Sequence, residues 1–360
     1  MLFISTLSGS NPTPMSAELT PIPVSATPGD QPRAIPTKDA RAEASVATPS
    51  GAAPTPSNTV IWSQLSKARL SLLVLLTAAV GFVVAPSNPD GWWIRLLWTC
   101  LGTALAAASA AMLNQVAEMR RDGLMRRTAQ RPLPAGHARR TTVFAVAILL
   151  GYAGCTVLAM GTTIMAAAFA GINILLYVLL YTPLKPRTTL NTLVGAVTGA
   201  IPPVIGWTAA TGSISPGAWA LFAILFVWQI PHFLALAWLY RADYMAGGFV
   251  MLPSRDPDGT ATGQACLLSS LMLVPVSLLG TLSGIAGFGY AAVAIAAGLW
   301  ISVLSLRFLL ERSDARARRL FFASLIYLPV LLTALVIDRG SVVTTATPVD
   351  GAVILEVPTQ

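Results

Sequence analysis

Asn114, Glu118 and Asp122 stand four positions apart in the segment NQVAEMRRDGLMRRTAQRP, and their spacing is the first indication of chemistry in the sequence. On an α-helix a step of four residues drifts by only about 40°, so the amide and both carboxylates project from one face. Carboxylates this close together repel one another unless a cation holds them. Mg²⁺ suits such a group, because it binds one or two carboxylates together with waters and substrate phosphates. The spacing predicts a magnesium site for a phosphate-bearing substrate.

Basic residues follow the acids directly, at Arg120, Arg121, Arg126, Arg127 and Arg131. A guanidinium group matches phosphate oxygens with two parallel hydrogen bonds, so these arginines would bind the same polyanion. Acids among arginines are also typical of a solvated, salt-bridged surface that binds nothing. The spacing alone leaves both interpretations open.

A second basic segment, YTPLKPRTTLN, places Lys185 and Arg187 in a proline-broken loop between two apolar runs. Two cations in a tight loop between helices make an anion site. The same pair could equally be a loop whose charge only orients the chain in a membrane.

His232 lies in the otherwise apolar stretch WQIPHF, where an ionisable residue is unusual. An ionisable group inside an apolar span indicates a functional site by default, although a hydrogen-bonded core histidine is the alternative. Asp243 follows at the end of the same predicted helix. We expect it to face the loop that holds Asp122, so that two acidic helix ends share the metal and the diphosphate.

The composition indicates the solvent in which these segments lie. Hydrophobic residues make up 54% of the 360 residues and charged residues only 11%, with a mean hydropathy of +0.68. Soluble domains carry about a quarter charged residues, so the chain is predicted to be a membrane protein. The net charge of +8 has no basic and aromatic stripe beside it, which argues against nucleic acid as a partner. The three cysteines lack a CxxC pair and are interpreted as small apolar residues.

The chain divides into a polar tail, a membrane body at 59–340 and a short C-terminal tail at 341–360. Residues 1–58 are rich in Pro, Ala, Ser and Thr and are predicted to be disordered. The body predicts an all-α bundle of nine transmembrane helices, since nine apolar runs approach the ~20 residues that span a bilayer. Their approximate limits are 68–86, 93–113, 141–160, 163–183, 190–210, 216–240, 265–285, 289–310 and 319–338.

The fifth run contains small residues and a proline pair, at Gly195, Gly199, Pro202, Pro203 and Gly206. Small residues let helices approach closely, and the prolines should break or kink this helix. We interpret the run as architecture beside a cavity.

The basic residues predict the orientation of the bundle. With a cytoplasmic N-terminus, 21 of the 23 Lys and Arg residues fall on the cytoplasmic side, and only Arg95 and Arg339 do not. This is a strong positive-inside pattern and it supports an odd number of spans.

Over about residues 60–340 these segments resemble the UbiA-type membrane prenyltransferases, and within them the branch that farnesylates haem, the haem O synthases. The resemblance rests on NQVAEMRRDGLMRRTAQRPLPAG, YTPLKPRTTLNTLVGAVTGAIPPVIGW and WQIPHFLALAWLYRADYMAGGFVMLP. The single Asp243 followed by Tyr244 is similar to the haem branch, whereas other members carry two acids there. Two departures, Pro186 and Val250, weaken only the detailed anion site.

The resemblance implies nine helices around a central cavity and a reaction of farnesyl diphosphate with haem B that yields haem O and diphosphate. It implies Mg²⁺ as the cofactor and His232 as a group that binds the haem iron or positions water. The implied metal ligands are Asn114, Glu118, Asp122 and Asp243. The implied substrate-binding residues are Arg126, Arg127, Arg131, Lys185, Arg187, Tyr181 and Tyr244.

Alternatives remain at the level of the sequence. Another UbiA-type enzyme would prenylate a quinone precursor or a chlorin, and a non-enzymatic transporter would also contain many spans. A transporter should show inverted repeats, which the sequence does not clearly contain. The expected location is the bacterial inner membrane, with the mitochondrial inner membrane as the alternative. Haem A synthase or an assembling terminal oxidase is the expected protein partner.

Overall fold

A computed structural model describes residues 56–86 and 90–340 of the chain. The chain divides into two units, residues 1–54 and 55–360, and only the second contains described residues. The predicted tails therefore lie outside the described residues, apart from the last three positions of the first tail.

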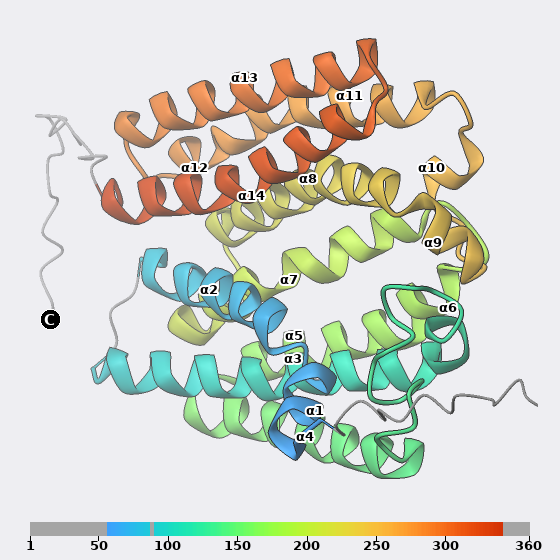
Figure 1. Cartoon of the computed structure of the whole chain (residues 1–360). Helices are drawn as coiled ribbons and strands as arrows, with labels where there is room; N and C mark the ends of the chain where they lie inside the picture. The colour runs from blue at the N-terminus through green and yellow to red at the C-terminus, as the bar shows by residue number, and fades with distance from the viewer. Residues whose placement is uncertain (1–55, 87–89, 341–360) are drawn as a thin grey trace, which may run out of the picture. The chain divides into compact units, whose positions relative to one another are not determined.

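The described residues form helices and no strand, with one isolated antiparallel bridge between Ala286 and Arg339. This confirms the all-α fold (Figure 1). The elements are α1 Asn58–Leu65, α2 Ala68–Val84, α3 Trp92–Asp122, α4 Arg140–Gly161, α5 Ile164–Leu175, the π-helix η2 Leu176–Tyr181, α6 Thr182–Leu184, α7 Asn191–Thr211, α8 Pro216–Leu239, α9 Arg241–Ala246, α10 Leu252–Arg255, α11 Thr260–Ser277, α12 Leu279–Leu282, α13 Phe288–Leu310 and α14 Asp314–Ile337.

The predicted number of spans, nine, is close to what the structure contains. Among the described residues, eight helices are long and apolar enough to cross a membrane. The first predicted span corresponds to α2, whose apolar part, Ser71–Val84, is shorter than the other eight. The chain is therefore a polytopic membrane protein.

The helices pack in layers, with α2 and α7 between the others. Figure 1 shows α11, α13 and α14 on one side of this pair and α3, α4 and α5 on the other. The contacts agree, because α7 packs on α2, α5 and α8, while α8 packs on α11 and α14. Large buried side chains such as Tyr290, Tyr327 and Phe308 fill the layer around α8 and α14.

The predicted close helix contact occurs between α2 and α7. A Cβ atom added at Gly206 would run into the carbonyl oxygen of Ala78, and one added at Gly81 would meet the carbonyl group of Pro203. Of the two predicted effects of the proline pair, a break or a kink, the break does not occur: α7 continues through Pro202 and Pro203 to Thr211. Neighbouring helices that pack this tightly hold a proline-containing segment helical inside a membrane.

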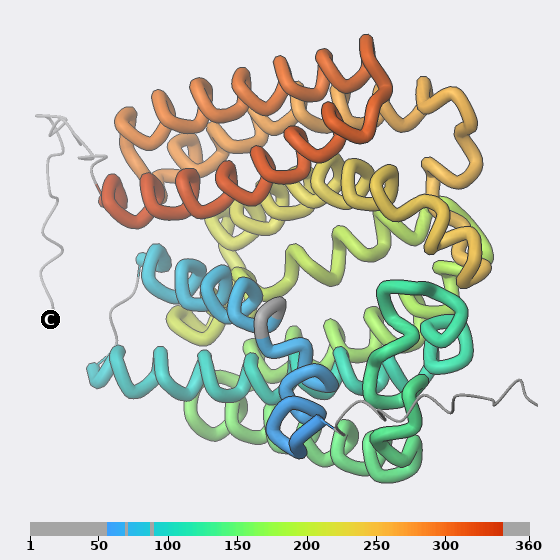
Figure 2. The backbone as a smooth tube through the Cα atoms, in the orientation of Figure 1, coloured from blue at the N-terminus to red at the C-terminus, as the bar shows by residue number. Residues whose placement is uncertain are grey.

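One end of the bundle gathers the polar segments that the sequence singled out (Figure 2). Arg121 on α3 donates 3.1 Å hydrogen bonds to the carbonyl oxygens of Gly247 and Gly248. The amide of Val250 donates to the carbonyl oxygen of Lys185 at 2.7 Å. The ends of α3, α6 and α9 are therefore tied together by main-chain acceptors, and side chains from all three converge there.

Candidate active site

The acidic face lies on a single helix. α3 continues for nine residues beyond the predicted end of its span and ends at Asp122, so Asn114, Glu118 and Asp122 share one regular helix. All three side chains are buried, with exposed fractions of 0%, 5% and 1%. Burial of two carboxylates is costly unless positive charge compensates it.

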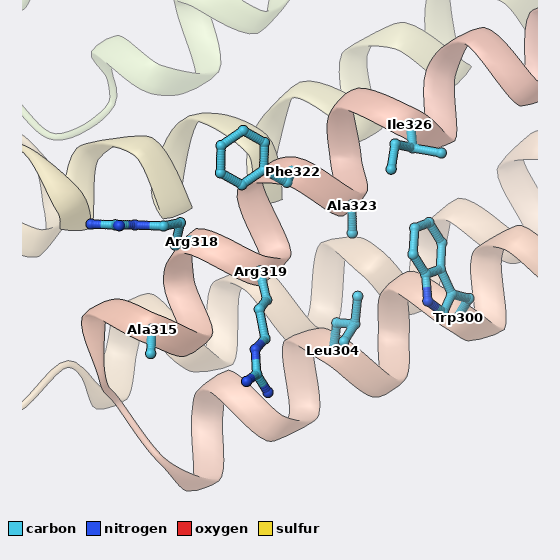
Figure 3. Close-up of a pocket in the computed structure, with 8 residues that line it drawn as sticks. All are labelled: Trp300, Leu304, Ala315, Arg318, Arg319, Phe322, Ala323 and Ile326. Carbon is cyan, nitrogen blue, oxygen red and sulfur yellow. The ribbon is translucent and has the colours of Figure 1, made fainter.

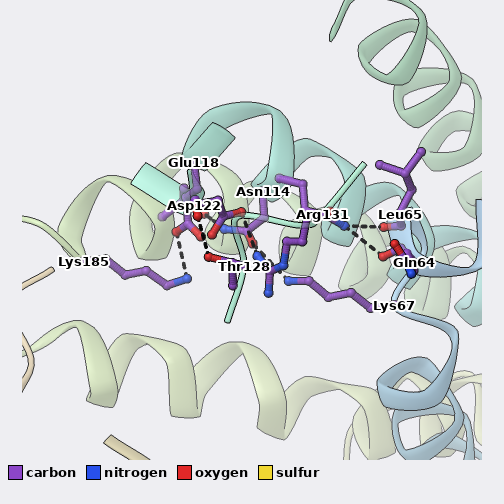
Figure 4. A network of polar contacts seen from close by, with 11 residues as sticks. Gln64, Leu65, Lys67, Asn114, Glu118, Asp122, Thr128, Arg131 and Lys185 are labelled. Carbon is purple, nitrogen blue, oxygen red and sulfur yellow. Dashed lines mark hydrogen bonds and ion pairs between the residues drawn. The ribbon is translucent and has the colours of Figure 1, made fainter. Parts of the chain in front are cut away.

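Two cations pair with the two carboxylates, and a third bonds the Asn114 amide (Figure 4). Arg131 Nη1 lies 2.7 Å from Asp122 Oδ2, and Lys185 Nζ lies 2.8 Å from Glu118 Oε1. The third cation, Lys67, donates a 3.1 Å hydrogen bond from Nζ to Asn114 Oδ1. The site is thus a buried cluster in which two carboxylates and one amide each contact a cation.

Lys67 is a further candidate residue of this site, and the sequence pattern presents it only as one of the basic residues before the first span. Its backbone has φ 49° and ψ 46°, and it is the only described residue other than glycine with positive φ. A left-handed conformation costs a non-glycine residue about 1 kcal/mol, so packing must hold it in place. The available signal was a lysine directly before an apolar run on the same side as the acids.

The surroundings of Lys67 disfavour its charged form. Burial lowers the pKa of Lys67 below its ordinary value, and the positive charges of Lys185 and Arg131 act in the same direction. Tyr177 and Glu118 oppose this shift of the pKa without cancelling it. An added anion beside Lys67 would relieve this repulsion.

Lys185 differs, since it is held by rings as well as by a carboxylate. Its Nζ lies 4.6 Å from the ring centre of Tyr181 and 5.6 Å from that of Phe249. Burial alone would lower the pKa of Lys185, but attraction to Tyr181 and Glu118 outweighs it and raises the pKa. Lys185 is therefore a fixed positive charge at the site.

Asn114 and the neighbouring Gln115 also hold the corner between α1 and α2. Gln115 Nε2 donates to the carbonyl oxygens of Gln64 at 3.2 Å and Leu65 at 2.7 Å, which caps the end of α1. Asn114 Nδ2 donates to Thr182 Oγ1 at 3.1 Å. The amide pair therefore fixes both Lys67 and the start of α6 relative to the acids.

The segment with Asp243 closes one side of this end of the bundle. The guanidinium of Arg127 lies 5.0 Å from the ring centre of Tyr240 and 5.9 Å from that of Tyr244. Asp243 is half-buried in the first turn of α9. The part of the chain that the structure describes has no group of three His, Cys, Asp or Glu side chains placed to hold a metal ion, so Asp243 does not complete one with Glu118 and Asp122.

Two predicted residues have less support from the geometry. Arg126 and Arg187 are exposed. Neither forms an ion pair or hydrogen bond with another described residue. Arg126 and Arg187 could therefore bind a ligand, but no contact with a described residue holds either side chain near the acids.

The donor set fits a hard cation that shares its coordination with a phosphate. Asp122 Oδ1 is buried and accepts no hydrogen bond from any described residue, while its other oxygen binds Arg131. A buried carboxylate oxygen without a partner is costly and suits a metal ion. Mg²⁺ needs only one or two carboxylates when substrate phosphates supply other oxygens, so Asp122 and Glu118 with the Asn114 amide suffice.

A cavity of about 170 Å³ opens beside Lys67 between α2, α3, α5 and α7. Along α3 it is lined by Ala107, Ala110 and Ala111, and its polar end contains Lys67 and Tyr177. A smaller cavity farther from the acids reaches Thr103 and shares Ala107 and Ala110 with the first. The small side chains of α3 thus leave a mainly apolar space that begins at the charged cluster.

His232 lies apart from the acids, between α8 and α14. Its ring stacks on Trp228 and Phe321, with centroid distances of 5.0 and 4.9 Å. Nδ1 lies 2.8 Å from Ser324 Oγ, which itself donates to the carbonyl oxygen of Phe321 at 2.6 Å. A hydroxyl group has one hydrogen, so Ser324 accepts from Nδ1–H and Nε2 keeps its lone pair.

Residues 74–326 match the sequence model of the UbiA prenyltransferase family. The chain belongs to the UbiA prenyltransferase family. Among curated relatives, it is 43% identical to a protoheme IX farnesyltransferase of Salinibacter ruber, over 78% of this chain and 99% of that one. It is 39% identical to a protoheme IX farnesyltransferase of Solibacter usitatus, over 77% of this chain and 97% of that one.

Solved structures of other proteins have the same fold. A structure of a digeranylgeranylglyceryl phosphate synthase superposes with a TM-score of 0.66 at 14% identity, covering 79% of this chain and 99% of that one. A UbiA homologue from Archaeoglobus fulgidus bound to GPP and Mg²⁺ gives a TM-score of 0.54 at 14% identity, covering 76% and 99%. At these identities the likeness concerns the fold, and the prenyltransferase assignment rests on the family match.

Proposed function

We propose that this prenyltransferase transfers the farnesyl group of farnesyl diphosphate to a vinyl group of haem B, with addition of water, and releases haem O and diphosphate. The observation that carries the proposal is the buried cluster of Asn114, Glu118 and Asp122 with a cation on each. The acceptor is inferred from the relatives, which are named protoheme IX farnesyltransferases and match more than three quarters of the chain.

The cations of the site act on the leaving group. Breaking the allylic C–O bond leaves both bonding electrons on the diphosphate, and Lys67, Arg131 and Lys185 stabilise the charge that develops there. Asn114, Glu118 and Asp122 would hold Mg²⁺, and Asp243, which does not group with these acids in the structure, would join them only with diphosphate bound. The ion would supply further positive charge to the leaving diphosphate. A Mg²⁺-bound relative supports the metal.

The farnesyl chain occupies the cavity that begins at Lys67. Its walls are mainly apolar, with alanines of α3 along one side, and Tyr177 lines the end near Lys67, where its ring would stabilise the allylic cation. The haem vinyl carbon then forms the new C–C bond. Water adds to the resulting cation, forming the hydroxyl group and releasing a proton to solvent or diphosphate.

His232 has the lone pair that the acceptor half of this reaction needs. With Nδ1–H donated to Ser324, Nε2 would serve either as a ligand of the haem iron or as the hydrogen-bond acceptor that positions the attacking water. The haem spectrum distinguishes these roles, as described in the Discussion.

The purified protein tests the proposal with haem B, farnesyl diphosphate and Mg²⁺ as the only additions. Glu118→Gln, Asp122→Asn and Asp243→Asn should each lower farnesyl transfer by about a thousand-fold, while haem B binding survives. Asp90→Asn, on an exposed loop before α3, is the matched control and should keep the wild-type rate. Near wild-type rates in both the Asp122 and Asp243 variants would refute the metal site, and transfer to a quinone precursor rather than to haem B would refute the acceptor.

For the membrane, we propose an inner bacterial membrane with the charged cluster and the N-terminus on the cytoplasmic side. The position of 21 of the 23 basic residues supports this orientation. Haem A synthase or an assembling terminal oxidase is the proposed recipient of the product, because a hydrophobic haem is best passed on within the bilayer.

A further inference from the structure

A groove of about 670 Å³ runs between α13 and α14, on the outside of the bundle and separate from the charged cluster. Its walls include Trp300, Phe322 and Ile326, which are 42%, 55% and 55% exposed. Large apolar side chains exposed in this way on a membrane protein face lipid. The groove therefore contacts the bilayer directly.

One end of this groove is basic. Arg318 and Arg319 line it, and Figure 3 shows Arg319 extending from α14 into the space beside Leu304 of α13. Neither arginine forms an ion pair or hydrogen bond with another described residue. The nearby acids pair with other arginines: Asp314 with Arg241 at 2.9 Å and Glu311 with Arg316 at 2.9 Å.

The depth of the groove matches one leaflet. From Ala315 to Ile326 it follows eleven helical steps of α14, a rise of about 16 Å, which is about half of the ~30 Å hydrocarbon thickness. The arginines stand at the end of α14 that the Asp314 contact ties to α9, where the basic residues of the bundle gather. An occupant therefore has its negative group at the membrane surface and its apolar part along Trp300 and Ile326.

We propose that this groove is a binding site for an anionic phospholipid, with the phosphate-bearing headgroup at Arg318 and Arg319 and one acyl chain between α13 and α14. Unpaired arginines at the level of the headgroups attract anionic lipid, and guanidinium matches its phosphate. A zwitterionic lipid has the same chains but carries no net charge, so the site discriminates by headgroup.

Native mass spectrometry of the full-length detergent-solubilised protein tests the proposal, with equimolar phosphatidylglycerol and phosphatidylcholine added. The wild type should retain phosphatidylglycerol preferentially, and each of Arg318→Gln and Arg319→Gln should reduce that preference by roughly five-fold. Arg312→Gln is the matched control, because Arg312 is exposed in the same region but does not line the groove. Equal retention of the two lipids, or an equal loss in the Arg312 variant, would overturn the proposal.

Tryptophan fluorescence locates the acyl chain of the bound lipid. Phosphatidylglycerol with brominated acyl chains should quench the fluorescence of Trp300, which is the part of the signal that Trp300→Phe removes. The double Arg318→Gln/Arg319→Gln variant should lose this quenching. Brominated phosphatidylcholine should quench little in either protein. Quenching of Trp300 that does not depend on the arginines would overturn the assignment of the headgroup. Displacement of phosphatidylglycerol by haem B would also overturn the proposal and assign the groove to the acceptor.

Discussion

Lys67 Nζ donates a 3.1 Å hydrogen bond to Asn114 Oδ1 across 47 positions of sequence. The contact joins a residue with a left-handed backbone, before α2, to the helix that carries both buried carboxylates. Because the amide oxygen is a neutral acceptor, this bond compensates less of the Lys67 charge than a carboxylate would. Lys67 is therefore the cation of the cluster that an added anion stabilises most.

The first prediction concerns Lys67 and pH. Its lowered pKa means that the ammonium loses its proton below the pH at which an ordinary lysine does. Diphosphate raises that pKa again, so binding should take up a proton, and affinity should fall as the pH rises through the pKa of free Lys67. Calorimetric titration with inorganic diphosphate and Mg²⁺ at a series of pH values below the ordinary lysine pKa of about 10.4, in two buffers, measures both effects.

Variants at this position sharpen the test. Lys67→Met should weaken diphosphate binding by roughly ten- to a hundred-fold, since a charged hydrogen bond contributes about 1.5–3 kcal/mol. Lys67→Arg stays charged and should show a flatter pH dependence, whereas Arg139→Gln, at an exposed position before α4, should behave as wild type. Lys67 also affects folding. Because its pKa is lower in the folded than in the unfolded chain, the unfolded state binds more protons between these two pKa values, and the free energy of unfolding rises with pH there. Identical pH profiles for wild type and Lys67→Arg would contradict the assignment.

The second prediction concerns Ser324, which fixes the His232 tautomer. Ser324→Ala removes the acceptor of Nδ1–H, and loss of such a supporting hydrogen bond typically weakens metal binding by 10–100-fold. Ser324→Thr keeps the hydroxyl group and should restore binding. Absorption spectra of haem B titrated into each variant without farnesyl diphosphate provide the measurement.

His232→Ala completes this series. A shifted Soret band in this variant identifies Nε2 as an iron ligand. An unchanged band with reduced product formation assigns Nε2 to the water instead. An unchanged band with normal turnover would remove His232 from the site altogether.

The third prediction concerns the length of the prenyl chain. Ala107 lines both parts of the cavity beside Lys67, so Ala107→Leu should block its far end while leaving the diphosphate cluster intact. Farnesyl transfer should fall by at least ten-fold, whereas geranyl diphosphate, one isoprene unit shorter, should still react. Ala108→Leu, on the same helix but outside the lining, is the control. Equal losses with both donors would mean that the chain lies elsewhere.

The fourth prediction concerns orientation. Cysteines at His137 and Ser213 should react with a membrane-impermeant reagent from opposite sides, because the first lies in the basic loop after α3 and the second in a loop without cations. The adjacent Gly136 and Gly212 are unsuitable, since both have positive φ that a cysteine would strain. Labelling of both positions from one side would reject the proposed topology.

The sequence by itself determined the fold class, the family and most of the charged groups near the acids. Apolar runs of membrane-spanning length predict helices because an unsatisfied backbone is too costly in lipid, and the spacing of Asn114, Glu118 and Asp122 predicts a shared face because helical periodicity is local. Both properties depend on neighbouring residues, which a single sequence contains.

Only the tertiary structure decided the pairings. Lys67 meets Asn114, Lys185 meets Glu118 and Ser324 orients His232 because helices distant in sequence pack side by side, and no local pattern encodes which residues then touch. The same holds for α7, where the prolines predicted a break or a kink and the structure shows a helix without a break, packed closely on α2 at Gly206. Contacts of this kind arise from shape complementarity between whole helices, a property of the packed bundle rather than of any one segment.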